Sequence, residues 1–563
     1  MNHDAPIIVV GAGPVGMAFA LLMARNGTPT IVLDRKPEIV DHPRAHYINT
    51  RTMELFRQWD CDDLIEEGQL PQEFMPTGLL AMMGGPTLEE REAISPGMVT
   101  SVAQDIVEHS ILKKLQTYDA ADIRWGWAVT GVEDKGDHVV VSCQRPDGTE
   151  TTLTSRWCVA ADGAGSIIRK TLGIEMVGDP CVDRVVNIYF FGQIISDKDT
   201  PALGAGSKDP EIPGAFIAMD GKLRHCFHYL LSEGQEAESY LNDPAVCETL
   251  IRRAAKIPAE RPVEIKSIKP WTMTALVAEK LRSGQIFLAG DAAHAFPPSG
   301  GFGLNSGVCD AHNLAWKLQA VLDGHANDDL LDSYERERQP VAFLNTAQSF
   351  RNSETMNIRK VAKPFNVSAD VVALINRSAA PTRVFSVAAT IADEDERRAM
   401  EMIEHGAALG QELGYSYADS PVIIDDGQPV PELTVARYVP NASPGSRAPH
   451  FWIATSNTRI SSLELFEGRF TLLTGAAGDG WRGAAAAIGD AANLAVFSIG
   501  EGLDGLDVDG NFHDLYGIHS DGAVLVRPDG HVAYRSAASV DDPESVLMSA
   551  LCTAGGARLP QPA

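Results

Sequence analysis

Residues 7–34 read IIVVGAGPVGMAFALLMARNGTPTIVLD, and they indicate the architecture of the N-terminal part of the chain. Residues 7–10 form a β-branched run of the kind found in buried parallel strands. A G-x-G-x-x-G turn follows, then an apolar helical stretch, and residues 30–33 indicate a second strand. The pattern is a βαβ unit that ends on an acid, Asp34, about 20 residues beyond the first glycine, as in dinucleotide-binding folds.

The glycines of this turn have separate physical roles. Gly11 allows the tight turn, Gly13 lets a pyrophosphate approach the backbone, and Gly16 lets the helix pack closely on the strand. The start of the helix, where Pro14 and Val15 lie, stabilises phosphate charge. The acid at the end of the second strand is expected to accept hydrogen bonds from a ribose diol. The motif predicts a bound dinucleotide but does not distinguish FAD from NAD.

The same N-terminal stretch resembles a membrane segment at first sight. Residues 6–24 carry no charge, which is compatible with a membrane helix or a secretory signal. Asp4 stands where a signal peptide needs Lys or Arg, and the glycines interrupt the apolar run. We therefore predict a strand, a turn and a helix here, and no membrane association.

Composition limits the class of protein. The chain has 563 residues, 44% hydrophobic and 22% charged, as expected for a globular protein of two or three domains. Its 47 basic and 75 acidic residues leave a net charge of −28, which disfavours nucleic acid or an anionic membrane surface as a partner. The 8 cysteines form no CxxC, so neither a metal site nor a disulfide framework is expected. Scattered cysteines favour a reducing, cytoplasmic location.

A second cluster, residues 157–169, reads WCVAADGAGSIIR. It predicts a strand that runs into Asp162-Gly163 and a helix that begins near Ser166. A strand-to-helix turn with Ser166 as N-cap explains this pattern locally, without a ligand. The cluster therefore gains functional meaning only beside the other motifs.

A third cluster, residues 285–307, reads QIFLAGDAAHAFPPSGGFGLNSG. It predicts a buried strand, a turn at Gly290-Asp291 and a helix to about Leu322. The glycines before the helix expose backbone N–H groups and let a flat ring lie against the chain. The helix start near Leu304 and Asn305 would stabilise negative charge on the pyrimidine edge of that ring.

Together, in this order and spacing, the motifs resemble the group A flavoprotein monooxygenases, which are single-component aromatic hydroxylases of the phenol hydroxylase kind. Asp162-Gly163 matches the Asp-Gly motif of that family, and Gly290-Asp291 matches its Gly-Asp motif. The segment 331–342 also resembles the one that follows the flavin-facing helix. The resemblance is strong over residues 5–345. It implies an α/β fold: a Rossmann-like FAD-binding domain, an antiparallel-sheet substrate domain and a C-terminal thioredoxin-like domain.

The resemblance also implies a domain organisation. The FAD-binding domain comprises residues 1–179 and 276–345, and the substrate-binding antiparallel sheet comprises residues 180–275. Strands are expected near 185–194, 215–219 and 223–231. Residues 346–412 are predicted to be helical, with the charged run at 393–398 as a solvated face.

Residues 413–563 resemble the thioredoxin-like domain of the longer hydroxylases. This region holds only Cys552 and no CxxC, so redox exchange through a dithiol is excluded. We expect a structural or dimer-supporting role, and a homodimer. Asp529 and His531 lie beside a predicted hairpin turn and are interpreted as turn residues.

The same resemblance assigns residues around non-covalently bound FAD. Arg44 matches an arginine near the flavin phosphates and ring, and Gln104 matches the residue that contacts the ribityl chain. The strand of Val129 contacts the adenine in relatives, and Arg35 is expected to cover it. Asp34 replaces the Glu of many relatives and keeps its charge with a shorter reach. The complete predicted FAD set is Gly11, Gly13, Pro14, Val15, Gly16, Asp34, Arg35, Arg44, Gln104, Val129, Asp162, Gly290, Asp291, Pro298, Gly301, Gly303, Leu304 and Asn305.

The implied reaction consumes O2 and either NADPH or NADH. Hydride reduces FAD, O2 adds to form a C4a-hydroperoxyflavin, and its terminal oxygen passes to an electron-rich ring carbon. The leading prediction is hydroxylation of a phenolic ring ortho to an existing hydroxyl, and the alternative is a larger polycyclic or polyketide-like aromatic substrate. Weak cationic character of the substrate sheet disfavours a carboxylate-anchored substrate, although Arg184 and Arg224 leave that possibility open.

Other classes of protein remain as alternatives. A flavoprotein reductase or a halogenase would share the FAD fold, but the sequence shows no halogenase-like Trp motif near the flavin. A non-enzymatic dinucleotide-binding protein would show no substrate-stimulated oxidation of NAD(P)H.

Residues 43–49 read PRAHYIN and contain the candidate base. Pro-Arg-Ala-His resembles the phenol-type hydroxylases, in which the histidine is thought to take the phenolic proton. A base with a pKa near working pH lowers the barrier, and histidine has an unperturbed pKa of ~6.5. We therefore predict His46 as the catalytic base, with Tyr47 and Pro297 lining the substrate pocket. Tyr47 is equally compatible with an ordinary core position.

Four further side chains lie in or near these motifs. His294 is predicted to support the third motif by hydrogen bonds, and Cys309 to be a small core residue. His225 and His228 lie in a predicted strand whose alternate residues reach the cavity.

Overall fold

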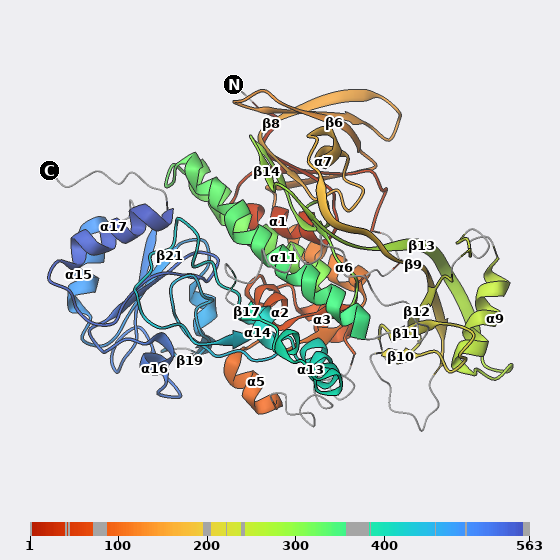
Figure 1. Cartoon of the computed structure of the whole chain (residues 1–563). Coiled ribbons are helices and arrows are strands. Elements are labelled where there is room, and N and C mark those ends of the chain that lie inside the picture. The colour runs from red at the N-terminus through yellow and green to blue at the C-terminus, as the bar shows by residue number, and fades with distance from the viewer. Residues whose placement is uncertain are drawn as a thin grey trace.

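The computed structural model describes residues 3–39, 42, 45–70, 87–194, 204–220, 222–232, 234–237, 243–355, 382, 384–456, 458–489 and 493–555. Arg44 lies outside these residues, so its predicted role is not addressed. Figure 1 shows a central region crossed by the long helix α11 (Asp332–Thr355), with one sheet region on the right and another on the left. Within the described residues, we find no helix with the length and apolar character needed to cross a membrane.

The N-terminal sheet is built around the predicted βαβ unit. Its described strands form an 8-stranded sheet in the order β14-β15-β8-β1-β2-β5, and the hairpin β6-β7 joins it at β8. The strands from β15 to β5 run parallel. The bounds are β1 (Ala5–Val10), β2 (Thr30–Asp34), β5 (Ala121–Trp125), β6 (Ala128–Asp134), β7 (Val139–Gln144), β8 (Glu150–Ala160), β14 (Arg282–Ser283) and β15 (Ile286–Leu288).

Helices cover this sheet because their apolar residues have no other place to be buried. Helix α1 (Pro14–Arg25) packs against α6 (Gln104–Leu115) and α10 (Phe302–Leu322), and its middle is apolar on all sides. Smaller elements surround the same layer. They are β3 (Tyr47–Ile48), β4 (Thr100–Ser101), α2 (Thr50–Gln58), α3 (Asp63–Gly68), α5 (Leu88–Ile94), α7 (Ile167–Thr171) and the 3-10 turn η2 (Gly290–Ala292).

An antiparallel sheet follows, in the order β10-β11-β12-β9-β13-β16 among the described strands. It confirms the expected substrate-domain architecture, and helix α9 (Pro244–Ala255) packs against it. Strand β16 lies inside the third motif, so this motif is hydrogen-bonded directly to the sheet. The bounds are β9 (Met176–Gly192), β10 (Gly204–Gly206), β11 (Gly214–Ala218), β12 (Arg224–Leu230), β13 (Val263–Ala278) and β16 (His294–Ala295).

The long strands β9 and β13 pass through the predicted domain limits at 180 and 275, and these limits stay predictions.

The helical prediction for residues 346–412 is wrong at β17 (Val384–Phe385), which pairs with β18 (Leu433–Thr434). Residues 356–381 lie outside the described part. The rest is helical in α11, η4 (Ala388–Thr390), α13 (Glu394–Gly406) and α14 (Leu409–Leu413), and the charged run at the start of α13 is largely exposed, as predicted.

The C-terminal region has the thioredoxin-like arrangement. Strands β21 and β22 are parallel and joined through α15, whereas β24 and β25 continue the sheet antiparallel and lead into α17. The bounds of these elements are β21 (Phe470–Thr474), α15 (Asp479–Ile488), β22 (Leu494–Ser498), β24 (Ala523–Val526), β25 (Val532–Ser536) and α17 (Pro543–Gly555). Further elements are β19 (Trp452–Ala454), β20 (Arg459–Ser461), β23 (Leu506–Asp507), α16 (Phe512–Tyr516) and the turns η3 (Asp328–Leu331) and η5 (Ser462–Leu465).

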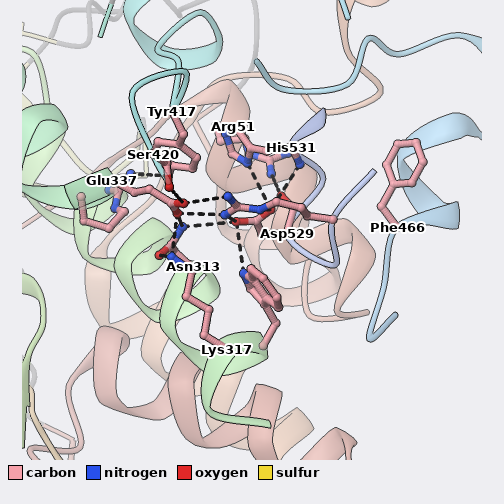
Figure 2. Close-up of polar contacts among 12 residues, drawn as sticks. Arg51, Asn313, Lys317, Glu337, Tyr417, Ser420, Phe466, Asp529 and His531 are labelled. Atoms are coloured by element: carbon pink, nitrogen blue, oxygen red, sulfur yellow. Dashed lines mark hydrogen bonds and ion pairs between the residues drawn. The ribbon is translucent and has the colours of Figure 1, made fainter. Parts of the chain in front are cut away.

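A buried charge cluster joins this region to the described residues between 3 and 355, which we call the FAD-type region (Figure 2). We call it the interdomain cluster, and it comprises Lys317, Glu337, Arg527 and Asp529. Both Arg527 Nη1 and Lys317 Nζ lie 2.7 Å from carboxylate oxygens of Glu337, and Arg527 also pairs with Asp529. Burial alone would raise the pKa of Glu337, but Arg527 and Lys317 lower this pKa to about 2. The cluster is therefore ionised and charge-balanced.

This arrangement changes the interpretation of the turn between β24 and β25. The turn exists, and Gly530 has a positive φ as such turns require. However, the Asp529 carboxylate is buried and accepts hydrogen bonds from Asn313 and Trp316 on α10, both at 3.2 Å. Asp529 is thus part of a domain contact and more than a turn residue. Local sequence could not indicate this, because its partners lie about two hundred positions away.

Candidate functional site

The predicted cofactor motifs meet at one edge of the N-terminal sheet. The glycine turn, Asp34, Asp162 and Gly290 follow β1, β2, β8 and β15, respectively, and these strands are consecutive neighbours in the sheet. Parallel strands present their carboxyl ends at the same edge, where α/β folds bind ligands. The structure therefore brings together three motifs that are far apart in the sequence.

The glycine turn has the geometry that its residues predict. Gly11 has φ +108°, a conformation that favours glycine. A Cβ atom on Gly16 would lie 1.9 Å from the carbonyl oxygen of Gly11, so helix and turn could not approach so closely with any other residue. A Cβ on Gly13 would meet nothing within 4 Å, which leaves open space over the backbone where a pyrophosphate is expected.

Asp34 stabilises the turn and retains capacity for a ligand. One carboxylate oxygen accepts from the Ala12 N–H at 2.8 Å, and the other accepts from the Lys36 N–H at 2.8 Å. Each carboxylate oxygen has a second lone pair, so a sugar diol could still be bound. Arg35 beside it is exposed, as a residue that covers a ligand from the solvent side would be.

Asp162 carries an unsatisfied atom. Its Oδ2 accepts from the backbone of Ile167 at 2.8 Å and Ile168 at 3.3 Å, while Ser166 caps α7 as predicted. Its Oδ1 is buried and has no hydrogen-bond partner among the described residues. Because a buried oxygen costs about 1–3 kcal/mol when left unpaired, we expect this atom to accept a hydrogen bond from a ligand hydroxyl.

The remaining predicted cofactor residues lie around this edge or at the start of α10. Val129 is half-buried in β6, and Asp291 is exposed in η2 directly after the β15 edge. Pro298, Gly301, Gly303 and Leu304 lie in the turn into α10 and its first residues. Gly303 faces open space, as Gly13 does.

Asn305 and Gln104 position the segment that contains the candidate base. Asn305 Oδ1 accepts from the Asn49 N–H at 3.0 Å, and its Nδ2 donates to the Tyr47 carbonyl at 3.0 Å. Gln104 Oε1 accepts from the Ala45 N–H at 3.0 Å. Two residues predicted to bind the cofactor therefore also hold residues 45–49 between α10 and α6.

His46 is half-buried, and its Nδ1 lies 3.0 Å from Ser101 Oγ. Burial and the nearby His228 lower its pKa to about 4. The pKa of His46 thus lies below the unperturbed value of ~6.5, because burial disfavours the charged imidazole. At neutral pH the ring is uncharged and can accept a proton. Ser101 was missed from the sequence because its pairing with Tyr47 through β3 and β4 is long-range.

The antiparallel sheet β10-β11-β12-β9-β13-β16 is called the roof sheet here. Its strand β12 holds His225 and His228, which face opposite sides of the strand, as positions three apart in a strand must. His225 stacks on Phe190, with ring centroids 5.6 Å apart, within the core of the roof sheet. His228 is close enough to His46 and His42 for their charges to interact, and its pKa is lowered to about 4 by burial and His42. His228 is thus the one of the two that lies on the side of His46, and its access to a substrate cavity stays a prediction.

The two arginines of the roof sheet that the sequence left open, Arg224 and Arg184, are already paired. Arg224 Nη2 lies 2.8 Å from both carboxylate oxygens of Asp105, and Arg224 Nε donates to the Tyr189 hydroxyl at 2.7 Å. Arg184 forms an exposed ion pair with Glu236 at 3.0 Å. Both residues left open by the sequence are therefore engaged with acids of this chain.

Tyr47 lies in a core environment, and its role in lining the substrate pocket stays a prediction. It packs against Leu70 and Val99, and its hydroxyl lies 3.4 Å from Glu412 Oε1. Pro297 is buried, and its carbonyl accepts from Ser349 Oγ at 2.6 Å.

A buried ion pair supports the third motif from behind. Asp310 on α10 accepts from His294 Nε2 at 2.7 Å and from the Gly290 N–H at 3.1 Å. Its other oxygen accepts from Arg338 Nε at 2.8 Å. The supporting role predicted for His294 agrees with this geometry, and Cys309 beside Asp310 is buried, as predicted. The described residues contain no cluster of His, Cys, Asp and Glu that could hold a metal ion.

Comparison with known proteins gives similarity over the whole chain. A model of the FAD binding domain matches residues 4–349, and a model of the aromatic-ring hydroxylase C-terminal domain matches residues 441–557. The chain is 33% identical to 4-methyl-5-nitrocatechol 5-monooxygenase of Burkholderia sp, with 97% of each chain covered. It is 29% identical to 2,4-dichlorophenol 6-monooxygenase of Cupriavidus pinatubonensis, with 98% of this chain and 96% of the relative covered.

Solved structures show the same similarity. The flavin-dependent monooxygenase PieE, in complex with FAD and substrate, superposes with a TM-score of 0.83 at 28% identity, covering 99% of this chain and 100% of that chain. Aklavinone-11 hydroxylase, in a ternary complex with FAD and aklavinone, gives 0.81 at 28% identity with the same coverage.

Proposed function

The chain belongs to the FAD-dependent aromatic-ring hydroxylases, and from this premise we propose that it hydroxylates a phenolic ring, ortho to an existing hydroxyl, with O2 and NADPH or NADH. The chemistry that FAD supplies when bound is the activation of O2 with electrons from the nicotinamide, so that one oxygen atom reaches the ring. The protein has to bind FAD, hold the ring beside it and remove the phenolic proton.

The residues at the sheet edge fit non-covalently bound FAD. Asp34 would accept from the ribose, the space over Gly13 would admit the pyrophosphate, and Asp162 Oδ1 would accept from a cofactor hydroxyl. The N-terminus of α10 would face the pyrimidine edge of the ring, where its partial positive charge stabilises an anionic ring.

The contact between His46 and Ser101 is the observation that carries the proposal of a phenolic substrate. If Nδ1–H donates to Ser101 Oγ, the lone pair of the other ring nitrogen is free to accept the phenolic proton. A phenolate that forms beside the imidazole raises the pKa of His46, because opposite charges stabilise each other. The aromatic ring of the substrate phenolate then carries the electron density that oxygen transfer requires.

The paired state of Arg224 and Arg184 supports a substrate without a carboxylate. Recruiting Arg224 to a substrate anion would leave Asp105, which is itself buried, without its partner. Breaking a buried ion pair in this way is strongly unfavourable. We therefore infer that the preferred ring carries hydroxyl, halogen, nitro or alkyl groups.

Aerobic oxidation of NADH and NADPH by the FAD-loaded protein tests this proposal. The panel is phenol, catechol, 2,4-dichlorophenol and 4-hydroxybenzoate, with ¹⁸O2 and mass spectrometry of the products. We expect one of the first three to stimulate oxidation at least tenfold and to gain one ¹⁸O atom. Preference for 4-hydroxybenzoate would contradict the inference about charge, and oxidation without any ¹⁸O product would contradict the hydroxylase assignment.

A larger polycyclic substrate is the second candidate. It is supported by the similarity to two solved structures: PieE in complex with FAD and substrate, and aklavinone-11 hydroxylase in complex with FAD and aklavinone. A hydroxylated anthraquinone added to the same panel tests this candidate. Stimulation by the anthraquinone alone would favour it over the simple phenol.

A further inference from the structure

A cavity of about 350 Å³ lies between the FAD-type region and the C-terminal region, away from the flavin motifs. Its wall includes the last turn of α1 and the second half of α10, whereas the predicted cofactor residues lie at the first turns of these helices. The helical rise from Leu304 to Trp316 is about 18 Å. The cavity is therefore distinct from the proposed flavin site.

Aromatic side chains dominate the wall. Trp316 and Phe470 meet edge-to-face with ring centroids 5.9 Å apart, and Trp59 lies 5.7 Å from the ring of His312. Phe470 comes from β21 of the C-terminal region and the other three come from the FAD-type region, so neither region forms this wall alone. The volume falls within the range of small-molecule sites and exceeds the voids that close-packed interiors usually contain.

Polar groups of the same wall lack partners. The side chain of His312 is only 8% exposed, and its ring makes no hydrogen bond to any described residue. The indole N–H of Trp59 and Nδ1 of His325 are also buried without a hydrogen-bond partner among the described residues. Burial and Arg51 lower the pKa of His312 to about 3, so this ring is neutral and can accept a hydrogen bond.

The charges of the wall disfavour an anion. Arg25 is the cation of the wall and is paired with Glu467, and it also donates to the Trp59 carbonyl at 3.0 Å. Asp323 adds a second carboxylate, which accepts from Gln319 at 2.9 Å. A ligand of this cavity should therefore carry no negative charge.

We propose that this cavity is a second small-molecule site, which takes an uncharged planar aromatic compound of one or two rings carrying a hydroxyl group. The rings lie among Trp59, Trp316 and Phe470, and the hydroxyl hydrogen-bonds to His312. Trp316 Nε1 donates to Asp529 Oδ2 at 3.2 Å, so the indole that lines the cavity is itself bonded to the interdomain cluster of Figure 2. Occupancy therefore stabilises the contact between the two regions.

Binding of 2-naphthol to the FAD-loaded full chain tests the proposal, with calorimetry for stoichiometry and tryptophan fluorescence for affinity. Ala315→Leu fills the cavity from α10, because Ala315 is buried and lines it. We expect this variant to lose the cavity binding event at least tenfold. Ala389→Leu is the matched control at an exposed position and should bind as the wild type does.

The variant His312→Phe distinguishes a specific ligand site from a cavity that is only a packing defect. It keeps the ring volume and removes the acceptor, so the preference for 2-naphthol over naphthalene should disappear while naphthalene still binds. A crystal soaked with 6-bromo-2-naphthol should show bromine between Trp316 and Phe470. Ala315→Leu protein with wild-type FAD content and unchanged 2-naphthol binding would overturn the proposal, as would bromine found solely at the flavin site. These readouts do not depend on hydroxylase activity.

Discussion

The chemistry proposed for His46 depends on its neighbours more than on histidine itself. Burial and His228 hold the imidazole neutral above pH 4, and Ser101 selects one orientation of the ring. A neutral base is available across the physiological range, whereas a base with a pKa of ~6.5 would be half protonated just below neutrality. The activity of the free enzyme should therefore persist to unusually acidic pH.

The first prediction concerns this pH dependence. For a phenolic substrate, kcat/KM should fall only as pH drops toward 4, because protonation of His46 then removes the acceptor. His46→Ala should lower kcat by 10²–10⁴-fold, the usual range for a general base, and this loss should shrink at pH 9 and above as more of the phenol is already ionised. Steady-state rates from pH 4.5 to 9.5 measure both effects. His46→Ala protein with normal FAD content and wild-type rates at every pH would remove His46 from the mechanism.

The second prediction concerns the unpaired oxygen of Asp162. Asp162→Asn removes the charge. When the amide oxygen accepts from the backbone of α7, the amide nitrogen replaces Oδ1 at the cofactor side, where it can donate a hydrogen bond but cannot accept one. A hydrogen bond to a charged group contributes about 1.5–3 kcal/mol, so the Kd for FAD should rise roughly tenfold to a hundredfold. Quenching of FAD fluorescence by the apoprotein measures this Kd. Asp147→Asn, in an exposed hairpin turn, is the matched control, and equal FAD affinity in both variants would contradict the assignment.

At the scale of elements, helices α10 and α11 act as one support for the flavin motifs. Asp310 and Arg338 are fully buried partners, and Arg338 also donates to the Ser306 carbonyl at 3.1 Å and the Tyr417 hydroxyl at 3.0 Å. Burial raises the pKa of Asp310, but His294 and Arg338 together bring it below its usual value. The backbone at Gly290 is thus held by the Asp310 carboxylate, whose ion pair with Arg338 joins α10 to α11.

The third prediction follows from this ion pair. Arg338→Met leaves the buried Asp310 carboxylate without its arginine partner and should cost about 3–5 kcal/mol of unfolding free energy. The double variant Arg338→Met with Asp310→Asn should be less destabilised than the sum of the single variants, because the unpaired charge is gone. Denaturant unfolding of the four proteins gives the coupling energy. Strict additivity would show that the two side chains act independently.

At the scale of the whole molecule, buried ion pairs connect the C-terminal region to the rest of the protein. Glu337 connects Lys317 of α10 with Arg527 of the C-terminal region and also accepts from Ser420 Oγ at 2.7 Å. A second buried contact joins Arg447 to Glu54 of α2. These ion pairs give orientation and specificity to the domain contact, although the desolvation of their charges limits their net stabilisation.

The fourth prediction tests whether the interdomain cluster holds the two regions together. Glu337→Gln leaves two buried cations with one carboxylate, so it should destabilise the folded protein by about 3–5 kcal/mol and lower the midpoint of thermal unfolding. It should also expose the junction near Ser420 to limited proteolysis. Glu394→Gln removes an exposed partner of Arg398 and should change stability by less than about 0.5 kcal/mol. Equal midpoints for the two variants would show that the cluster does not hold the domains together.

Much of the fold could be predicted from local sequence. Residues 7–34 predict β1, α1 and β2 because strand and helix periodicities and the glycine turn are encoded within a short stretch. The same holds for the strand-to-helix turn at Ser166 and for the start of α10. Residues 384–385 escaped prediction because β17 exists only through its partner β18, many positions further along the chain.

The candidate site divides in the same way. The sequence by itself determined the local geometry of the predicted cofactor residues, since the turn at Gly11 needs a residue that tolerates positive φ and Asp34 places a charge at a strand end. Only the tertiary structure decided that Ser101 orients His46, that Asp105 neutralises Arg224 and that Asp529 belongs to a domain contact. The physical reason is that burial and charge pairing depend on residues brought together from distant parts of the chain, whereas turns and strand periodicity depend on neighbours in sequence.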